Sequence, residues 1–158
     1  MYDKGTHQWE IHASLKTRRR MAASAFLENQ NLFVTGGSLS GFGGLTSTEI
    51  VNPDGSVNEG RDLPEYKYRH CMVTMHDGPV AILGGYPSSQ FRKVYIYDPS
   101  TNSYTEGPSM IFDRREAACT LFHSQKHGNR PVILISGGGQ TTSEIFDYTV
   151  ANTWEQSK

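Results

Sequence analysis

The sequence predicts an all-β protein built from repeats of four short strands. Three apolar runs, at residues 32–37, 79–85 and 132–138, each end in a pair of glycines. Such runs between turn residues are typical of buried strands. The first glycines stand at positions 36, 84 and 137, which gives steps of 48 and 53 residues. Recurrence at a period of about 50 residues indicates a repeat architecture. No stretch has a convincing helical period.

The composition limits the kinds of partner that the chain can bind. It has 158 residues, a usual length for one domain, and a formal net charge of −1. A nearly neutral chain gives no electrostatic case for nucleic acid or an anionic membrane surface. No apolar stretch approaches the roughly 18 residues of a spanning helix, and the first residues do not read as a signal peptide. We therefore expect no nucleic acid and no membrane as partner. The compartment stays unknown, with the cytoplasm slightly favoured.

The first strand of each repeat is expected to consist mostly of small residues that follow a basic residue. These strands are predicted within 19–26, 68–75 and 114–121. Small side chains suit a strand that its neighbours crowd. A turn then leads into the glycine-ended run, and the Asp77–Gly78 turn of the second repeat is a strong hairpin signal.

The third and fourth strands of each repeat are expected to flank a turn that follows an acidic or amide residue. In the second repeat, Tyr97 and Asp98 precede the turn and Tyr104 follows it. The Asp side chain can accept hydrogen bonds from turn amides, and the two aromatic rings can pack across the strand pair. The acidic or amide residue recurs at positions 3, 52, 98 and 147.

Taken together, these marks resemble the kelch repeat. The matching residues are the three glycine pairs, the aromatic–Asp pairs at 97/98 and 146/147, and the late aromatics Tyr104 and Trp154. The resemblance implies that each repeat is a four-stranded antiparallel blade of a β-propeller. The expected fold class is therefore all-β, a partial kelch-type β-propeller of about three and a half repeats. A β-trefoil, which also has three repeats, is disfavoured by the glycine pairs and the Asp turn.

The repeats predict three blades, at 18–63, 66–110 and 113–158, with 1–12 as the outer strands of an incomplete blade. A closed propeller typically has 4–8 blades. We therefore expect a fragment of a longer kelch protein, lacking at least upstream blades, a truncated gene product, or a chain that self-associates to complete its ring.

The loops after the glycine pairs and the starts of the small-residue strands are expected on one face, where function tends to reside. In kelch domains that bind peptides, the corresponding positions line the binding face. By resemblance, the candidate partner-binding residues are Arg20, Ser38, Arg69, Tyr86, Arg115 and Gln140. Arg binds carboxylates in a bidentate manner and Tyr offers rigid contact area. The alternative is that the arginines only bond backbone carbonyls between blades. The predicted function is a non-catalytic module for a protein or peptide partner.

We find no nucleophile elbow and no paired-carboxylate signature for catalysis. The Gly41-x-Gly43-Gly44 run does not open a helix, so it is no nucleotide site. His123 and His127 have a spacing found in some zinc sites, but no third ligand is near in sequence. We therefore expect no metal and no cofactor.

Two points stay open at this level. Cys71 and Cys119 are expected to be small buried side chains, with a disulfide or a reactive thiol as the alternative. The alternative function is a fragment of a kelch-type enzyme, such as a galactose-oxidase-like copper oxidase or a sugar epimerase.

Overall fold

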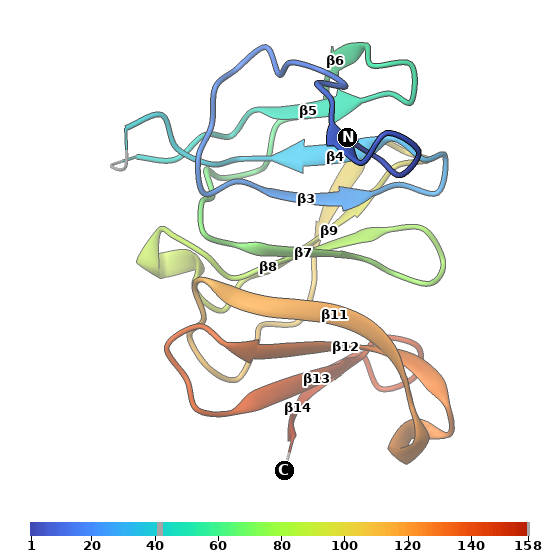
Figure 1. Ribbon diagram of the computed structural model, residues 1–158. Helices are drawn as coiled ribbons and strands as arrows, with labels where there is room; N and C mark the ends of the chain where they lie inside the picture. The colour runs from blue at the N-terminus through green and yellow to red at the C-terminus, as the bar shows by residue number, and fades with distance from the viewer. Residues whose placement is uncertain (41–42, 158) are drawn as a thin grey trace.

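A computed structural model describes residues 1–40 and 43–157 of the chain. It contains three four-stranded antiparallel sheets and one two-stranded sheet, and in each larger sheet the strand order follows the chain. The all-β fold class is thereby confirmed, and we call the three larger sheets blades 1, 2 and 3. Figure 1 shows them stacked along the molecule in chain order. Among the described helices, none is both long and apolar enough to cross a membrane.

The strands are short. Blade 1 consists of β3 (Ala23–Phe26), β4 (Leu32–Thr35), β5 (Thr48–Val51) and β6 (Val57–Glu59). Blade 2 consists of β7 (Cys71–Thr74), β8 (Val80–Leu83), β9 (Val94–Asp98) and β10 (Ser103–Glu106). Blade 3 consists of β11 (Ala117–Ser124), β12 (Arg130–Gly137), β13 (Ser143–Asp147) and β14 (Thr153–Ser157). The 3₁₀ turns η1 (Ser88–Gln90) and η2 (Gln125–His127) lie in connecting segments. In Figure 1 the first strands β3, β7 and β11 run side by side.

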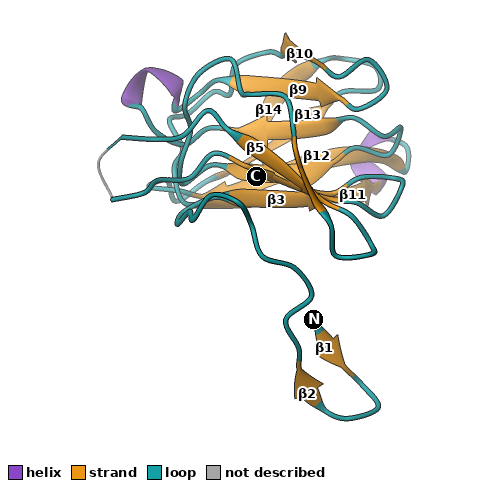
Figure 2. Cartoon of the chain, turned by 90° about the horizontal axis from the view of Figure 1, so that it is seen from above, coloured by secondary structure: helices purple, strands orange, loops and turns teal. Residues whose placement is uncertain are grey.

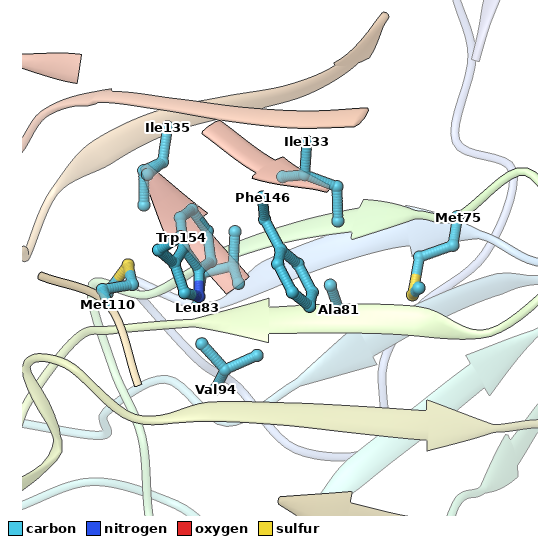
Figure 3. Close-up of a cluster of buried hydrophobic side chains, with 9 residues drawn as sticks. All are labelled: Met75, Ala81, Leu83, Val94, Met110, Ile133, Ile135, Phe146 and Trp154. Carbon is cyan, nitrogen blue, oxygen red and sulfur yellow. The ribbon is translucent and has the colours of Figure 1, made fainter. Parts of the chain in front are cut away.

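The apolar core lies between neighbouring blades. Strand β8 is buried along its whole length, because Ala81 and Leu83 pack towards blade 3 while Val80 and Ile82 pack towards blade 1. Burial on both faces explains its unbroken apolar run. Figure 3 shows the cluster between blades 2 and 3, whose members are Met75, Ala81, Leu83, Val94, Met110, Ile133, Ile135, Phe146 and Trp154.

The glycine pairs allow a neighbouring blade to approach. Gly84 has φ +60°, and a Cβ placed on it would lie 2.4 Å from the carbonyl oxygen of Arg114. Gly36 has φ +57°, and its Cβ would lie 2.3 Å from the carbonyl oxygen of Lys67. Only glycine accommodates both the left-handed backbone and this close contact.

The turns between the third and fourth strands have the expected chemistry. Asp98 Oδ1 accepts a hydrogen bond from the Ser100 amide at 2.8 Å, and the Tyr97 and Tyr104 ring centroids are 5.0 Å apart. In blade 1 this position is Asn52, and the turn amide of Ser56 is bound by Asp54 instead, at 2.9 Å.

The first residues form a separate hairpin of β1 (Tyr2–Asp3) and β2 (Gln8–Trp9). Figure 2 shows it away from the blades, joined by an extended segment. The centroids of its Tyr2 and Trp9 rings are 5.5 Å apart, and the corresponding ring pairs in the outer hairpins of blades 2 and 3 are 5.0 Å apart. Within the described residues this hairpin pairs with no further strand, and Trp9 is 81% exposed.

The two cysteines correct one expectation. Cys71 in β7 and Cys119 in β11 form a disulfide with a Cα–Cα distance of 6.1 Å, so they are not separate thiols. Both are only half-buried and pack at the border of the core between blades 2 and 3. The disulfide forms because β7 and β11 are neighbours and the two side chains enter the same interface from opposite sides.

Candidate binding face

The predicted partner-binding residues gather at the ends of the first and second strands, a region that we call the loop face. An isolated bridge joins Arg20 to Ser38 in blade 1, and the corresponding bridge of blade 2 joins Tyr68 to Tyr86. Tyr68 is therefore the counterpart of Arg20, and Arg69 lies one position later in its blade. Sequence reasoning, guided by the basic residues, assigned this position to Arg69.

A backbone ladder connects the blades at this face. Met21, Arg69 and Glu116 stand one or two residues before a first strand, and each has a φ of 57–58°. The Arg69 amide donates to the Met21 carbonyl, and the Glu116 amide donates to the Arg69 carbonyl, both at 2.8 Å. A left-handed backbone at three non-glycine residues is costly and persists where surrounding contacts fix it. These residues are therefore held in a defined row across the three blades.

Tyr86 is the centre of an aromatic and cationic cluster. Its ring stacks on Tyr68 at a centroid distance of 5.0 Å and an interplanar angle of 9°. Phe91 meets it edge-on, also at 5.0 Å. The Arg115 guanidinium lies 5.3 Å from the Tyr86 centroid and 5.4 Å from that of Phe91, within the range of cation–π attraction. Arg69 lies 5.8 Å from Tyr86.

Tyr68 and Phe91 were not among the predicted site residues. The signal for Tyr68 was its place in the segment that opens the first strand, where the other two repeats have arginine. The signal for Phe91 was weaker, because only its position in the polar loop after Tyr86 marked it.

The arginines of the loop face differ in how their charge is balanced. Arg69 pairs with Glu116 at 2.5 Å. Arg115 is exposed and makes no ion pair within the described ranges. The same holds for Arg20, which lines a cavity of about 310 Å³ together with Arg18, Arg19, Ser38 and Leu39. Uncompensated guanidinium groups therefore stand on both sides of the neutralised Arg69.

The two remaining predicted residues are hydrogen-bonded to neighbouring segments. Ser38 is 1% exposed, and its backbone exchanges hydrogen bonds with Arg20. Gln140 donates from its side chain to the Asp113 carbonyl at 3.2 Å. Both residues thus hold the loops in place in this structure.

Two buried arginines next to the face organise its loops. Arg114 bonds the carbonyls of Gly137 at 2.6 Å and Thr142 at 2.9 Å, and its Nε lies 2.8 Å from Glu144. Arg19 repeats this arrangement in blade 1 with Gly36, Ser47 and Glu49. Burial opposes the ionisation of Glu49, but hydrogen bonds from Arg19 and from two backbone amides prevail and lower its pKa. Arg19 and Arg114 are thus the arginines that bind the loop carbonyls, and the side chains of the adjacent Arg20 and Arg115 are exposed to solvent.

Blade 2 replaces this ion pair by a lysine and a tyrosine. Lys67 is fully buried, and its Nζ donates to the Gly84 carbonyl at 2.8 Å and lies 5.3 Å from the Tyr95 ring centroid. Burial lowers the pKa of Lys67 to about 7, although the nearby Glu65 carboxylate acts in the opposite direction. Glu65 also accepts a hydrogen bond from Gln90 at 2.5 Å, which anchors the loop that carries Tyr86 and Phe91.

The histidines singled out by spacing do not converge. His127 lies in η2, where its Nδ1 is 2.8 Å from Ser124 Oγ and its Nε2 is 3.1 Å from Glu155. His123 instead packs edge-on against His76. Across residues 1–40 and 43–157, no group of three or more His, Cys, Asp or Glu side chains could hold a metal ion. Of the glycine-rich run, Gly41 lies outside the described residues.

Two curated proteins are similar in sequence to the chain. Spermatocyte protein spe-26 of Caenorhabditis elegans is 30% identical over 123 residues, which cover 76% of this chain and 21% of that protein. Kelch-like protein 23 of Mus musculus is 27% identical over 141 residues, which cover 87% of this chain and 24% of that protein. The chain thus spans less than a quarter of the length of these relatives.

Among solved structures, a copper-bound fungal alcohol oxidase of the AA5 family is similar. The TM-score is 0.64 at 17% identity, over 77% of this chain and 27% of that one. At this identity the likeness concerns the fold alone. No protein-family model matches the chain.

Proposed function

The chain is part of a kelch-type β-propeller, and from this premise we propose that it is a non-catalytic module that binds a protein or peptide partner through its loop face. Kelch-like relatives support this class of function over catalysis. The likeness to an oxidase concerns the fold and favours no reaction.

The observation that carries the proposal is the setting of Arg115. Its guanidinium lies against Tyr86 and Phe91 without a carboxylate among the described residues. A guanidinium held by two rings has already lost much of its rotational freedom, so less entropy is lost when it binds. Its N–H groups form a planar fork that matches a carboxylate. We therefore expect a partner segment that presents Asp, Glu or a terminal carboxylate.

The neighbouring residues support the same kind of partner. Tyr86 and Tyr68 offer flat aromatic area, which is frequent at the centre of protein interfaces. Arg20 adds a second exposed guanidinium on the other side of the Arg69–Glu116 pair. A segment that crosses the face from Arg115 to Arg20 would meet cationic, aromatic and cationic groups in turn.

A peptide library displayed on phage and selected on the purified chain tests this proposal. We expect selected peptides to be enriched in acidic residues, and Arg115→Ala or Tyr86→Ala to weaken their binding about tenfold or more. Arg92→Ala is the control, since it removes the same charge from an exposed arginine that already lies 3.9 Å from Asp113. Selection without acidic enrichment, or unchanged binding by Arg115→Ala, would contradict the proposal.

Two further assays address the alternatives. Copper binding together with turnover of sugar alcohols would favour the oxidase alternative over a non-catalytic module. Light scattering on a sizing column tests self-association against the 17.6 kDa mass of one chain. A defined dimer would support two partial rings that complete each other, whereas a monomer would contradict self-association.

A further inference from the structure

We propose that the Cys71–Cys119 disulfide is a redox-sensitive link that controls how firmly the loop face is held together between blades 2 and 3. The disulfide joins the first strands of these blades, and we call the line along which β7 and β11 meet the seam. The inference goes beyond partner binding because it concerns the state of the seam itself. Its effect on a partner rests on the proposed function, but its primary test does not.

The link lies directly beside the central row of the loop face. Cys71 follows Arg69 by two residues, and Cys119 follows Glu116 by three. The Glu116 amide donates to the Arg69 carbonyl at 2.8 Å, and the two side chains form an ion pair. Since the cysteines stand only two and three residues from this hydrogen bond, a covalent link between them limits how far Arg69 and Glu116 can separate.

The chain contains a matched seam without a covalent link, between blades 1 and 2. The strand register makes Ala23 the counterpart of Cys71, since both pair with the residue just before the first glycine. Met72 is likewise the counterpart of Cys119, since each pairs with the residue two positions before the first glycine of its own repeat. This seam has the same ladder bond, from the Arg69 amide to the Met21 carbonyl at 2.8 Å. It therefore serves as an internal control.

The two cysteines are not sealed inside the core, and we take their border position as the route of access for a small thiol. Both cysteines are half-buried, at the border of the core cluster rather than within it. A low-molecular-weight thiol such as glutathione is the reductant. Its thiolate attacks one sulfur, the S–S bond breaks, and the released cysteine takes up a proton. A second glutathione thiolate then attacks the glutathione sulfur of the mixed disulfide. That S–S bond breaks, the second cysteine leaves as a thiolate and takes up a proton, and glutathione disulfide is released, so that two electrons reach the two cysteines.

Once reduced, the seam beside the cysteines is held by packing, the Glu116–Arg69 ladder bond and the partly exposed Arg69–Glu116 pair, while the bond from the Gly85 amide to the Arg114 carbonyl lies further along the chain. Exposed ion pairs contribute little to stability, and a protein opens locally most easily where few buried contacts hold it closed. Reduction should therefore increase the opening of the Glu116–Arg69 bond while the unlinked seam stays as it was. Arg115 adjoins Glu116, so the same opening would loosen its position against Tyr86.

Amide hydrogen exchange of the whole chain, oxidised and after treatment with glutathione, tests the proposal. We expect the Glu116 amide to exchange about tenfold faster in the reduced chain, whereas the Arg69 amide, bonded across the unlinked seam, keeps its rate. Thiol titration should rise from none to two thiols per chain, and reoxidation should restore the slow exchange. The double variant Cys71→Ser/Cys119→Ser should reproduce the reduced pattern in the absence of reductant.

Three outcomes would overturn the proposal. Glutathione could fail to release the two thiols, Glu116 exchange could stay unchanged on reduction, or the Arg69 amide and the amides of blade 1 could accelerate equally. The last result would mean that the disulfide supports the whole fold rather than the seam. The reduced and reoxidised wild-type chain decides the question even if the double variant does not fold. Loss of acidic-peptide selectivity would bear on the proposed function alone.

Discussion

The ammonium group of Lys67 lies 5.3 Å from the centre of the Tyr95 ring, at the place where blades 1 and 3 each have a buried Arg–Glu ion pair. The two ion pairs join Arg19 to Glu49 at 2.6 Å and Arg114 to Glu144 at 2.8 Å. The middle blade therefore holds an amine in a largely apolar setting, with a backbone carbonyl as its hydrogen-bond acceptor. This difference between equivalent positions leads to the first two predictions.

Arg114→Ala should destabilise the chain by about 3–5 kcal/mol, because it leaves Glu144 buried without a cation and frees two loop carbonyls. Urea unfolding followed by circular dichroism measures the loss. The exposed Arg115→Ala is the matched control and should cost no more than about 1 kcal/mol, since it loses only exposed cation–π contacts. Equal losses of unfolding free energy in the two variants would show that the buried Arg114–Glu144 pair contributes no more to stability than the exposed Arg115.

Stability should rise with pH between about 7 and 10.5 because of Lys67. In this interval the unfolded chain keeps the lysine proton, whereas the folded chain, with the pKa lowered to about 7, releases it. The unfolded state then binds more protons, so the free energy of unfolding increases with pH. From pH 7 to pH 9 the gain should be about 2 kcal/mol. Lys67→Met, which has no proton to lose, should lack this gain in parallel urea titrations.

His70 should act at acidic pH. Its Nε2 is 2.8 Å from Thr35 Oγ1, and burial, assisted by Lys67, lowers its pKa to about 3. Below about pH 6.5 the unfolded chain takes up a proton that the folded chain refuses, so stability is lost as the pH falls towards 3. Between pH 7 and pH 5 the loss should be about 2 kcal/mol. His70→Phe should show a smaller loss over the same interval, and an identical slope would exclude this role for His70.

Gly84→Ala and Gly137→Ala should differ although both glycines have positive φ. A Cβ at Gly84 would be 2.4 Å from the Arg114 carbonyl, whereas one at Gly137, with φ +74°, would meet nothing within 4 Å. Both substitutions force an unfavourable backbone region at about 1–2 kcal/mol. Gly84→Ala should cost about 1–3 kcal/mol more, because the neighbouring blade must shift. Thermal unfolding of both variants compares them, and equal melting temperatures would contradict the role assigned to the close contact.

The features predicted correctly from sequence are those set by local chemistry. The glycine at position 84 and the Asp98 turn are readable because a positive φ and an Asx-type hydrogen bond demand particular residues. The pairing of the third strand with the fourth follows from such short turns, whereas longer loops join the second strand to the third, between Thr35 and Thr48 and between Leu83 and Val94.

The features that sequence reasoning missed depend on register and on partners far along the chain. Aligning the repeats by their basic residues placed Arg69 beside Arg20 and Arg115, although the bridges assign that position to Tyr68. The disulfide was obscured because Cys71 and Cys119 stand at positions one residue apart in their repeats. The positions of β7 and β11 in the structure show that this one-residue offset lets both side chains point into the interface between blades 2 and 3.

The close contacts at Gly36 and Gly84 set the positions of the blades independently of the side chains on the loop face. Blade spacing is set by carbonyl oxygens resting against glycines, and a carbonyl is the same in every residue. The exposed side chains beside these contacts can therefore differ between blades while the backbone arrangement stays the same. Arg20, Tyr68 and Arg115, which occupy the same position in the three blades, are an example. Such a scaffold can acquire a new ligand by exchanging a few exposed residues, and it lends itself to laboratory redesign of specificity by the same route.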